Sequence, residues 1–524
     1  MPGEKFYITT SIPYVNAPPH IGHALEFVQA DAIARFRRLK GDNVFFLTGT
    51  DEHGAKIARA AHVAGKTPRR FVDEHTARFQ KLLELLLVSH DDFIRTSDTK
   101  RHWPGAEELW TRLENAGDIY KATYKGLYCI GHEAFVTEKD LKDGICEDHG
   151  KPPEVIEEEN YFFRLSKYSH GIEARIESGE LSIIPEKRKN EMLSFVREGL
   201  SDISFSRPSK DIPWGIPVPR DASATMYVWC DALSNYITAL GFGSPDDSRF
   251  RLFWPADLHV IGKDISRFHT LIWPGMLLAA GLPLPKKIFV HGFILSGGRK
   301  MSKTIGNVID PFDLISTYGA EALRYFLLRE IPVFDDGDIT RQRFEEAYTA
   351  HLANGVGNLV SRTAAMVKKY FSGHIVQPSD ETLFSVPFKS NIDTLHIPGR
   401  DLDVSRVSIA TFANSVRLRW EQALEEYNFN DALGSIWDLI GVLDKYIQEY
   451  EPYKLIATDK EKTQAVLWQL SCALGHIAWF LVPLLPGTAT RIQNILGIKE
   501  NEMVENKHEY SFSEKGDMLF PRIS

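Results

Sequence analysis

The first fifty residues alternate between strand-like and helix-like segments, and this pattern limits the fold more than any other feature. Residues 6–14 are an apolar run bounded by proline and asparagine, which predicts a buried strand. From Gly22 apolar side chains recur at helical spacing until Gly41, and residues 43–51 are apolar again. Strand, helix and strand within residues 6–51 form a βαβ unit, which predicts a parallel sheet with a right-handed crossover.

The composition sets further bounds. A chain of 524 residues is too long for one hydrophobic core, so we expect roughly three or four domains. The net charge of −9 gives no sign of nucleic-acid binding, so RNA would have to meet a local basic face, such as one carrying the lysines and arginines of 353–370. Four cysteines in so long a chain predict a reducing compartment rather than a disulfide framework. The N-terminus lacks an apolar signal core, which favours a cytoplasmic protein.

Residues 465–486 are apolar and long enough to span a membrane. They contain Gln469, His476 and Pro483, and no matching stretch occurs elsewhere in the sequence. We therefore predict a buried helix of an α-domain and no membrane partner.

The pattern changes near residue 118 and again near 345. Short strands, turns and charges after 118 predict an inserted module, and beyond 345 the apolar spacing is helical only. We predict an α/β fold with a Rossmann-type doubly wound parallel sheet, an inserted small knuckle-bearing domain and a following all-α helical bundle. The predicted parts are 1–117 and 229–295 for the two halves of the Rossmann domain, 118–228 for the inserted connective domain, 296–344 for a linking region with a basic loop, 345–495 for the helical domain, and 496–524 for a tail that packs back.

Two histidines, His20 and His23, bracket an Ile-Gly pair where the first helix begins. A helix N-terminus at the carboxyl edge of a parallel sheet offers unpaired N–H groups and the positive end of the helix dipole, which suit phosphate. Gly22 lets a flat base or a sugar approach the backbone closely. Taken alone, the histidines are better explained as capping or surface residues in a proline-stiffened turn.

A second stretch, RKMSKT at 299–304, follows a predicted strand and a Gly-Gly pair. Lys300, Ser302 and Lys303 on such a loop can close on a polyphosphate, and the lysines can neutralise the charge that develops as pyrophosphate leaves. Taken alone, this stretch is better explained as a solvated basic turn.

Together the two motifs resemble the HIGH and KMSKS signatures of the class I aminoacyl-tRNA synthetases. HIGH is unaltered at 20–23, and KMSKT at 300–304 differs only at Thr304. Further segments are similar to those of methionyl-tRNA synthetases and occur in that family's order: TTSIPYVNAPPHIGHALE, FLTGTDEHG, ENYFFRLSKY, WGIPVP, YVWCDAL, VIGKDI, FVHGFIL and GNLVSR. The resemblance is strong over 5–365. It implies that ATP activates methionine as an adenylate, releasing pyrophosphate, and that the 3′-terminal ribose hydroxyl of a tRNA then attacks the adenylate.

The resemblance also implies roles for individual residues. ATP would be bound by His20, Gly22, His23, Asp264, Lys300, Ser302 and Lys303, of which His20, His23, Lys300 and Lys303 would act in catalysis, and Mg²⁺ is expected with ATP. Methionine would lie among Ile12, Tyr14, Asp51, Arg207, Trp229, Ala232, Leu233, Tyr236 and His291. The Asp51 carboxylate is a counter-charge for the amine, Arg207 would position it, and the aromatic rings suit a thioether. Leu233 stands where the family is expected to have proline.

Cysteine and histidine recur in two pairs with the spacing of a structural zinc knuckle. Cys129-x-x-His132 and Cys146-x-x-His149 supply four ligands for one Zn²⁺. The stretch resembles the family's knuckle, in which a cysteine commonly replaces His132. A metal-free knuckle is the alternative, and Cys230 and Cys472 are predicted to be buried thiols.

The helical part is expected, from the resemblance, to bind the CAU anticodon of initiator and elongator tRNA-Met. Asn358 and Arg362 match residues expected to read the anticodon. Tyr453 stands where tryptophan is expected and can stack on a base. A surface position on a helix is the alternative for each. No further tRNA-binding domain follows the tail MLFPRI, which predicts a monomer.

Three other functions stay open. The chain could be an inactive relative that binds tRNA, a class I ligase for another small apolar amino acid, or a nucleotidyltransferase that shares the two motifs. Intact HIGH, KMSKT and Asp51 count against the first, and the helical third and the knuckle count against the last.

Overall fold

The computed structural model describes residues 3–129, 134–136, 141–146, 150–301, 307–387, 394–397, 400–403, 409–499, 507–513 and 518–522. The chain forms two compact units. The first unit consists of Met1–Pro19, Gly41–Leu83 and Ser89–His291, and the second consists of His20–Lys40, Glu84–Val88 and Gly292–Ser524.

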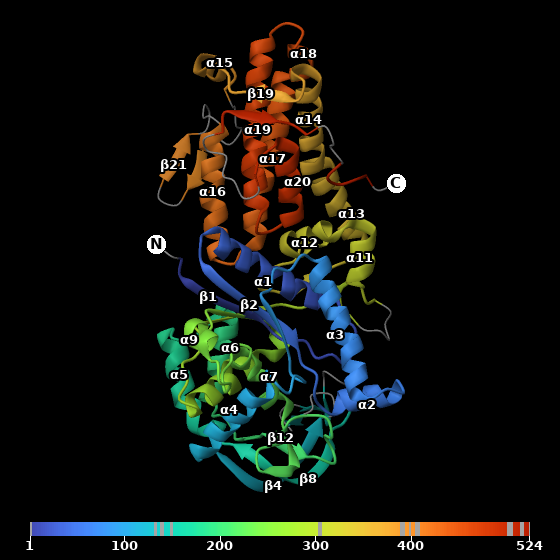
Figure 1. Cartoon of the computed structure of the whole chain (residues 1–524), viewed down its shortest axis with the longest axis vertical. Helices are drawn as coiled ribbons and strands as arrows, with labels where there is room; N and C mark the ends of the chain where they lie inside the picture. Colours follow the sequence, from blue (N-terminus) through green and yellow to red (C-terminus); the bar gives the residue numbers. More distant parts are fainter. Residues whose placement is uncertain are drawn as a thin grey trace. The chain divides into compact units, whose positions relative to one another are not determined.

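A six-stranded parallel sheet organises the first unit (Figure 1). Its strands are β1 (Lys5–Thr10), β2 (Asn43–Thr50), β3 (Asp92–Arg95), β9 (Ser182–Ile184), β14 (Leu258–Gly262) and β15 (Lys287–His291). They lie in the order β3-β2-β1-β14-β15-β9, and each neighbouring pair is parallel. The strand order reverses between β1 and β14, and such a switch point leaves a crevice at the carboxyl ends of the two strands. The predicted Rossmann-type sheet is confirmed.

The central strands are apolar because helices cover the sheet. Tyr7 of β1, Trp110 of α4 (Trp103–Asn115) and Trp273 of α10 (Trp273–Ala279) belong to one core and are at most 1% exposed. The remaining helices of this unit are α2 (Ala55–Val63), α3 (Pro68–Leu85), α5 (Ser169–Ser178), α6 (Glu186–Arg197), α7 (Val228–Leu233), α8 (Asn235–Thr238) and α9 (Ser248–Phe253).

The segment between 118 and 228 forms antiparallel sheets, in keeping with its short strands and turns. One has the order β10-β8-β4-β5, the other the order β11-β13-β12. Their strands are β4 (Ile119–Cys129), β5 (Ala134–Val136), β8 (Glu154–Phe163), β10 (Ile203–Ser204), β11 (Ser206–Pro208), β12 (Pro217–Val218) and β13 (Asp221–Met226), and β6 (Leu141–Lys142) pairs with β7 (Ile145–Cys146). The same segment also supplies β9, an edge strand of the large sheet. Three residues are too few to show a period, so the sequence did not reveal this strand.

The second unit is mainly helical, and Figure 1 shows α17, α19 and α20 running side by side. Its helices are α1 (Ile21–Leu39), α11 (Pro311–Tyr318), α12 (Ala320–Arg329), α13 (Arg341–Ala347), α14 (Asn358–Phe371), α15 (Asp380–Phe384), α16 (Ile409–Glu425), α17 (Phe429–Tyr450), α18 (Pro452–Leu455), α19 (Lys460–Leu481) and α20 (Pro486–Leu496). Its strands are β16 (Ile294–Ser296), β17 (Arg299–Lys300), β18 (Gly337–Asp338), β19 (His374–Val376), β20 (Thr394–Ile397), β21 (Arg400–Asp403) and β22 (Glu509–Ser511). The bundle is as predicted, whereas β19–β22 were not anticipated.

The helix α1 follows β1 in the chain but belongs to the second unit. Its Asp31 forms an ion pair with Arg324 of α12 at 2.7 Å, and both side chains are fully buried. Arg35 donates to the same carboxylate at 2.8 Å. The ring of Phe36 packs edge-on against Trp420 of α16, with ring centroids 5.5 Å apart. Polar and aromatic contacts thus hold α1 to the bundle.

The apolar stretch at 465–486 falls mostly within α19. This helix is buried along most of its length, including Gln469 and His476. Within the described ranges, no helix combines the length and apolarity that crossing a bilayer requires.

Candidate active site

The segments that follow β1 and β2 are joined at the carboxyl edge of the sheet. The N–H of Asp51 donates to the carbonyl of Pro13 at 2.9 Å, and the N–H of Val15 donates to the carbonyl of Asp51 at 3.1 Å. These bonds place Asp51, which is 8% exposed, beside Tyr14. Ile12 and Tyr14 pack against the core of the unit. Asp51 and Tyr14 therefore lie side by side at the carboxyl edge of the sheet, in the segments that follow β2 and β1.

The neighbouring strands β14 and β15 end in line with each other. Gly262 closes β14 and is in register with His291, which closes β15. A Cβ at Gly262 would lie 2.8 Å from Asp264 Oδ1 and 3.6 Å from His291 Cε1. A side chain at Gly262 would therefore require the Asp264 carboxylate to shift, whereas the distance to His291 is an ordinary van der Waals contact. Asp264, predicted to bind ATP, and His291, predicted to bind methionine, therefore lie at the same edge of the sheet, while their binding roles stay predictions.

The predicted wall of the methionine pocket is formed by α7 and α8. Trp229, Ala232 and Leu233 lie on α7, and Tyr236 lies on α8. The Trp229 ring stacks on Phe268, with centroids 3.7 Å apart and planes 10° apart. The other three are buried. Leu233, where proline is expected, is accommodated as a core side chain within α7.

The Tyr236 hydroxyl has a defined partner. It lies 2.7 Å from His269 Nε2, and His269 Nδ1 lies 3.0 Å from the carbonyl of Ile265. A carbonyl only accepts, so Nδ1 carries a proton, and in a neutral ring Nε2 accepts from Tyr236. His269 thereby orients the hydroxyl of a predicted pocket residue. The sequence contained no motif that singled out His269.

Arg207 lies on β11 and is 4% exposed. Its Nη1 donates to the Ser204 hydroxyl and the Ser206 carbonyl, both at 2.7 Å. Its guanidinium also lies over the rings of Tyr128 and Tyr227, at 5.4 and 5.1 Å from their centroids. These contacts hold a buried cation, and its predicted action on the amine-binding aspartate stays a prediction.

His20 and His23 cap the N-terminus of α1 reciprocally. The His20 Nδ1 accepts from the N–H of Gly22, and the His23 Nδ1 accepts from the N–H of His20, both at 3.1 Å. The two rings stack with centroids 3.8 Å apart. Partial desolvation lowers the pKa of His20, although much of its surface stays exposed, which favours the neutral ring that such acceptance requires. A neutral ring that accepts at Nδ1 has its proton on Nε2, a donor suited to phosphate oxygens.

The basic motif begins in a hairpin of β16 and β17. Its turn is Gly297-Gly298, with φ of 62° and 72°, values that favour glycine and the hairpin turn. The backbone of Lys300 ends β17. Ser302 and Lys303 lie outside the described residues, as does Thr304. Their predicted role on pyrophosphate stays a prediction.

Half of the predicted zinc ligand set can be described. Cys129 ends β4 and Cys146 ends β7, and their side chains are 4% and 2% exposed. His132 and His149 lie outside the described residues. All four cysteines of the chain are buried, and none is in a disulfide. Among the residues that the structure describes, no group of three or more candidate ligands is assembled.

The predicted anticodon residues lie on the bundle. Asn358 and Arg362 are one turn apart on α14, and Arg362 Nη1 lies 3.9 Å from the carboxylate of Asp444 on α17. Tyr453 lies on the short helix α18, is 46% exposed, and donates to Glu451 at 3.0 Å. An exposed aromatic ring and a half-buried arginine are compatible with base stacking and base-edge contacts.

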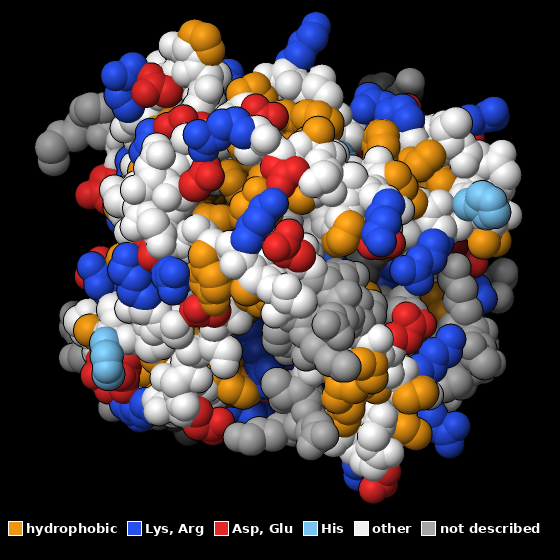
Figure 2. All heavy atoms as spheres, turned by 90° about the horizontal axis from the view of Figure 1, so that it is seen from below, with side chains coloured by type: hydrophobic (Ala, Val, Ile, Leu, Met, Phe, Trp, Pro, Cys, Tyr) orange, Lys and Arg blue, Asp and Glu red, His pale blue; other side chains and the backbone are white. Residues whose placement is uncertain are grey.

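Among the described residues on the face that Figure 2 shows, which views the molecule from the lower end of Figure 1, positive side chains do not gather in one place. Lysine and arginine are interspersed there with acidic and hydrophobic side chains. The part of this face that the structure describes therefore carries no broad basic patch that would attract RNA.

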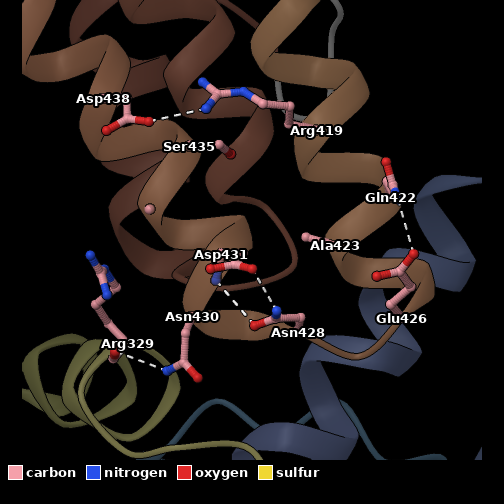
Figure 3. A pocket seen from close by; sticks show the side chains of 11 residues that line it. Arg329, Arg419, Gln422, Ala423, Glu426, Asn428, Asn430, Asp431, Ser435 and Asp438 are labelled. Atoms are coloured by element: carbon pink, nitrogen blue, oxygen red, sulfur yellow. Dashed lines mark hydrogen bonds and ion pairs between the residues drawn. The ribbon is translucent and has the colours of Figure 1, made fainter. Parts of the chain in front are cut away.

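A polar pocket of about 570 Å³ opens among α12, α16 and α17 (Figure 3). Its side chains bond mainly to one another: Arg419 to Asp438 at 3.2 Å, and Gln422 to Glu426 at 3.0 Å. Asn430 donates to three carbonyls at the end of α12, those of Leu328, Arg329 and Ile331. Since these amide bonds cap a helix end, the pocket wall joins α12 to α17. None of its lining residues is among those predicted to bind a ligand.

Sequence reasoning missed a buried cluster beside the predicted methionine pocket. Asp231 bonds to His53 and His102 through its two carboxylate oxygens. His53 and Asp231 fall within the segments FLTGTDEHG and YVWCDAL that carried the resemblance. The available signal was Asp231, the one charged residue in the otherwise apolar segment VWCDAL. Because buried charged residues are rare unless they are paired, this aspartate indicates a buried partner.

The fold and these motifs define a class of protein. The family model described as "tRNA synthetases class I (M)" matches residues 6–147 and 136–364. With its parallel sheet, switch point and HIGH helix start, the chain is a class I tRNA synthetase.

Individual relatives narrow the class. The chain is 44% identical to a methionine–tRNA ligase of Clostridium acetobutylicum over 99% of this chain and 78% of that protein, and 42% identical to that of Brucella suis over 95% and 93%. It is also similar to the structure of Mycobacterium tuberculosis methionyl-tRNA synthetase in complex with methionyl-adenylate, with 37% identity, a TM-score of 0.90 and coverage of 99% of this chain and 100% of that one. The chain belongs to the methionine–tRNA ligase family.

Proposed function

We propose that this chain attaches methionine to its cognate tRNA at the expense of ATP, through a methionyl-adenylate intermediate. The observation that carries the proposal is the set of residues at the carboxyl edge of the sheet, in which Asp51 lies beside Tyr14. A carboxylate there can bind the amine of an amino acid, and the aromatic wall of Trp229 and Tyr236 suits a thioether. The similarity to methionine–tRNA ligases over nearly the whole chain supports this substrate.

The chemistry requires positioning and charge stabilisation rather than a protein nucleophile. The methionine carboxylate attacks the α-phosphorus of ATP, a new C–O–P link forms, and pyrophosphate leaves with the electron pair of the broken P–O bond. His20 and His23 would donate Nε2 protons to phosphate oxygens. Lys300 and Lys303, with Ser302, would stabilise the leaving pyrophosphate. The tRNA hydroxyl then attacks the carbonyl carbon and loses its proton, the bond from that carbon to the phosphate oxygen breaks, and AMP leaves with the electron pair.

Other parts of the proposal concern binding. Gly22 would leave room for adenine, and Asp264 would bind the ribose or support the frame of the active site. Mg²⁺ is expected with the phosphates of ATP. We propose that Asn358, Arg362 and Tyr453 contact the anticodon, and that the chain works in the cytoplasm as a monomer.

A single structural Zn²⁺ is also proposed. Thiols at two strand ends, both nearly excluded from solvent, fit sulfur ligands at Cys129 and Cys146. His132 and His149 would complete a tetrahedral set. When bound, the ion would supply folding energy and no chemistry in the reaction.

An exchange assay with a panel of amino acids tests the proposal. Radiolabelled pyrophosphate should enter ATP only when methionine is present. Faster exchange with leucine or cysteine than with methionine would show that another amino acid is the substrate. Folded protein that gives no exchange with any amino acid would favour an inactive relative.

A further inference from the structure

Asp231 is a buried carboxylate with a different histidine on each oxygen. Its Oδ2 lies 2.6 Å from His53 Nδ1, and its Oδ1 lies 2.7 Å from His102 Nε2. The three side chains are at most 2% exposed. A carboxylate with no access to water is costly to bury unless both of its oxygens have hydrogen-bond donors, and here the two histidines supply them.

The three residues come from segments that are distant in the chain. His53 lies two residues after Asp51, in the segment that follows β2. His102 immediately precedes α4. Asp231 lies within α7, two residues after Trp229. The cluster therefore connects the segment that carries the amine-binding carboxylate to the helix that carries the pocket wall.

The direction of each hydrogen bond is fixed by the carboxylate. Burial raises the pKa of Asp231, but the charges and hydrogen bonds of His53 and His102 outweigh that effect and hold the pKa below its ordinary value. An ionised carboxylate only accepts, so His53 Nδ1 and His102 Nε2 both carry protons.

The far side of each ring is also constrained. His102 Nδ1 lies 2.8 Å from the hydroxyl of Thr238 on α8. His53 Nε2 is buried without a hydrogen-bond partner among the described residues. The rings of Trp103 and Trp214 flank His53 edge-on, with centroids 6.0 and 5.5 Å away. Neither imidazole can turn without losing contacts, so the cluster is a stiff link.

We propose that Asp231, held by His53 and His102, is a positioning residue for methionine. The cluster sets the separation between Asp51, which would bind the amine, and the α7 wall, which would bind the side chain. A substrate held at both ends is sensitive to that separation, whereas ATP is bound by other residues. This inference rests on the proposed function. The three residues would act through Asp51 and α7 and would not themselves touch the substrate.

The two histidines allow matched substitutions because they donate through different nitrogens. An asparagine amide replaces Nδ1 at position 53, and a glutamine amide replaces Nε2 at position 102, while leucine at either place fills space without donating. We expect His53→Leu and His102→Leu to raise the KM for methionine at least about tenfold, because a buried carboxylate oxygen is left unpaired. The KM for ATP and the kcat should change less than about twofold. His53→Asn and His102→Gln should recover most of the methionine affinity.

Asp257→Asn is the matched control for a loss of stability alone. Asp257 is 8% exposed, accepts from the Tyr7 N–H at 2.8 Å and pairs with Lys286 at 2.6 Å, in the same unit. This variant should lower the melting temperature and leave the KM for methionine unchanged. If a leucine variant does not fold, Asp231→Asn, which keeps the side-chain volume, takes its place in the same comparison.

The outcomes separate the inference from the proposed function. A selective rise in the KM for methionine, with rescue by the amide variants, supports the positioning role. The positioning role is overturned if the leucine variants raise the KM for methionine and the KM for ATP alike. It is also overturned if they only lower the melting temperature, as Asp257→Asn should. In both cases methionine-dependent exchange by the wild type would still support the proposed function. Wild-type protein with no methionine-dependent exchange would instead refute the proposed function.

Discussion

Replacing Asp31 by asparagine removes a charge from a buried ion pair that holds α1 to the bundle. The Arg324 guanidinium is fully buried and donates to the carbonyls of Leu86 and Leu484, each at 2.9 Å, in addition to its 2.7 Å contact with Asp31. Arg35 shares the same carboxylate. The substitution keeps the volume of the side chain and one acceptor oxygen, so the lost charge is the main change.

The expected cost follows from these contacts. Removing one partner of a buried ion pair costs about 3–5 kcal/mol. Arg324 retains its carbonyl acceptors in Asp31→Asn, which places the cost near the lower limit, at about 3 kcal/mol. This value corresponds to a roughly 150-fold increase in the equilibrium constant for opening.

Hydrogen exchange read by mass spectrometry is the suitable assay. A chain with two compact units need not unfold in one step, whereas amide exchange reports the opening of α1 and α12 directly. Glu425→Gln is the control. The Glu425 side chain is 37% exposed and pairs with Arg37 of α1 at 3.1 Å and with Lys40. Solvent-exposed ion pairs of this kind contribute below about 1 kcal/mol to stability. Equal acceleration of α1 exchange in both variants, or less than about fivefold in Asp31→Asn, would refute the reasoning.

Three further predictions concern the reaction, the metal and the bundle. Alanine at His20 or His23 should lower the kcat of pyrophosphate exchange far more than it raises the KM for methionine, and equal effects on both would count against a phosphate-binding role. Purified protein should contain about one zinc per chain by elemental analysis, and a folded chain without stoichiometric metal would argue for a metal-free knuckle. Burial raises the pKa of Asp444, and Arg362 offsets this only in part. The Asp444 carboxyl therefore stays protonated to higher pH in the folded state than in the unfolded state. The contribution of Asp444 to the free energy of unfolding is fully present below the unfolded pKa and is lost as pH rises through the folded pKa. Urea unfolding should show that Asp444→Asn loses less stability than the wild type over this interval, and parallel pH profiles would contradict the prediction.

Local pattern was sufficient to predict the sheet and the bundle. The strands β1, β2, β14 and β15 are apolar runs of five to eight residues, long enough to be recognised. The three-residue strands β9, β19 and β22 are too short to show a period. Helical spacing likewise predicted that α1 is a helix, but it contains no information about which element the helix packs against.

Candidate site residues could be named from the sequence where they occur in short motifs, and their roles stay predictions. Tyr14, Asp51 and His291 could be named because each lies in a segment with a family resemblance. The cluster around Asp231 could not, because its partners His53 and His102 are 178 and 129 residues away in the chain. Pairing over such separations depends on the tertiary fold, which no local spacing encodes.

The most direct test of the central claim is the charging of tRNA by the purified chain. With ATP and radiolabelled methionine, a tRNA that carries the CAU anticodon should become methionylated, and the label should be released by mild alkali as expected for an aminoacyl ester. The same tRNA with a changed anticodon should be charged much more slowly. An active, folded chain that forms methionyl-adenylate but transfers no methionine to either tRNA would contradict the account.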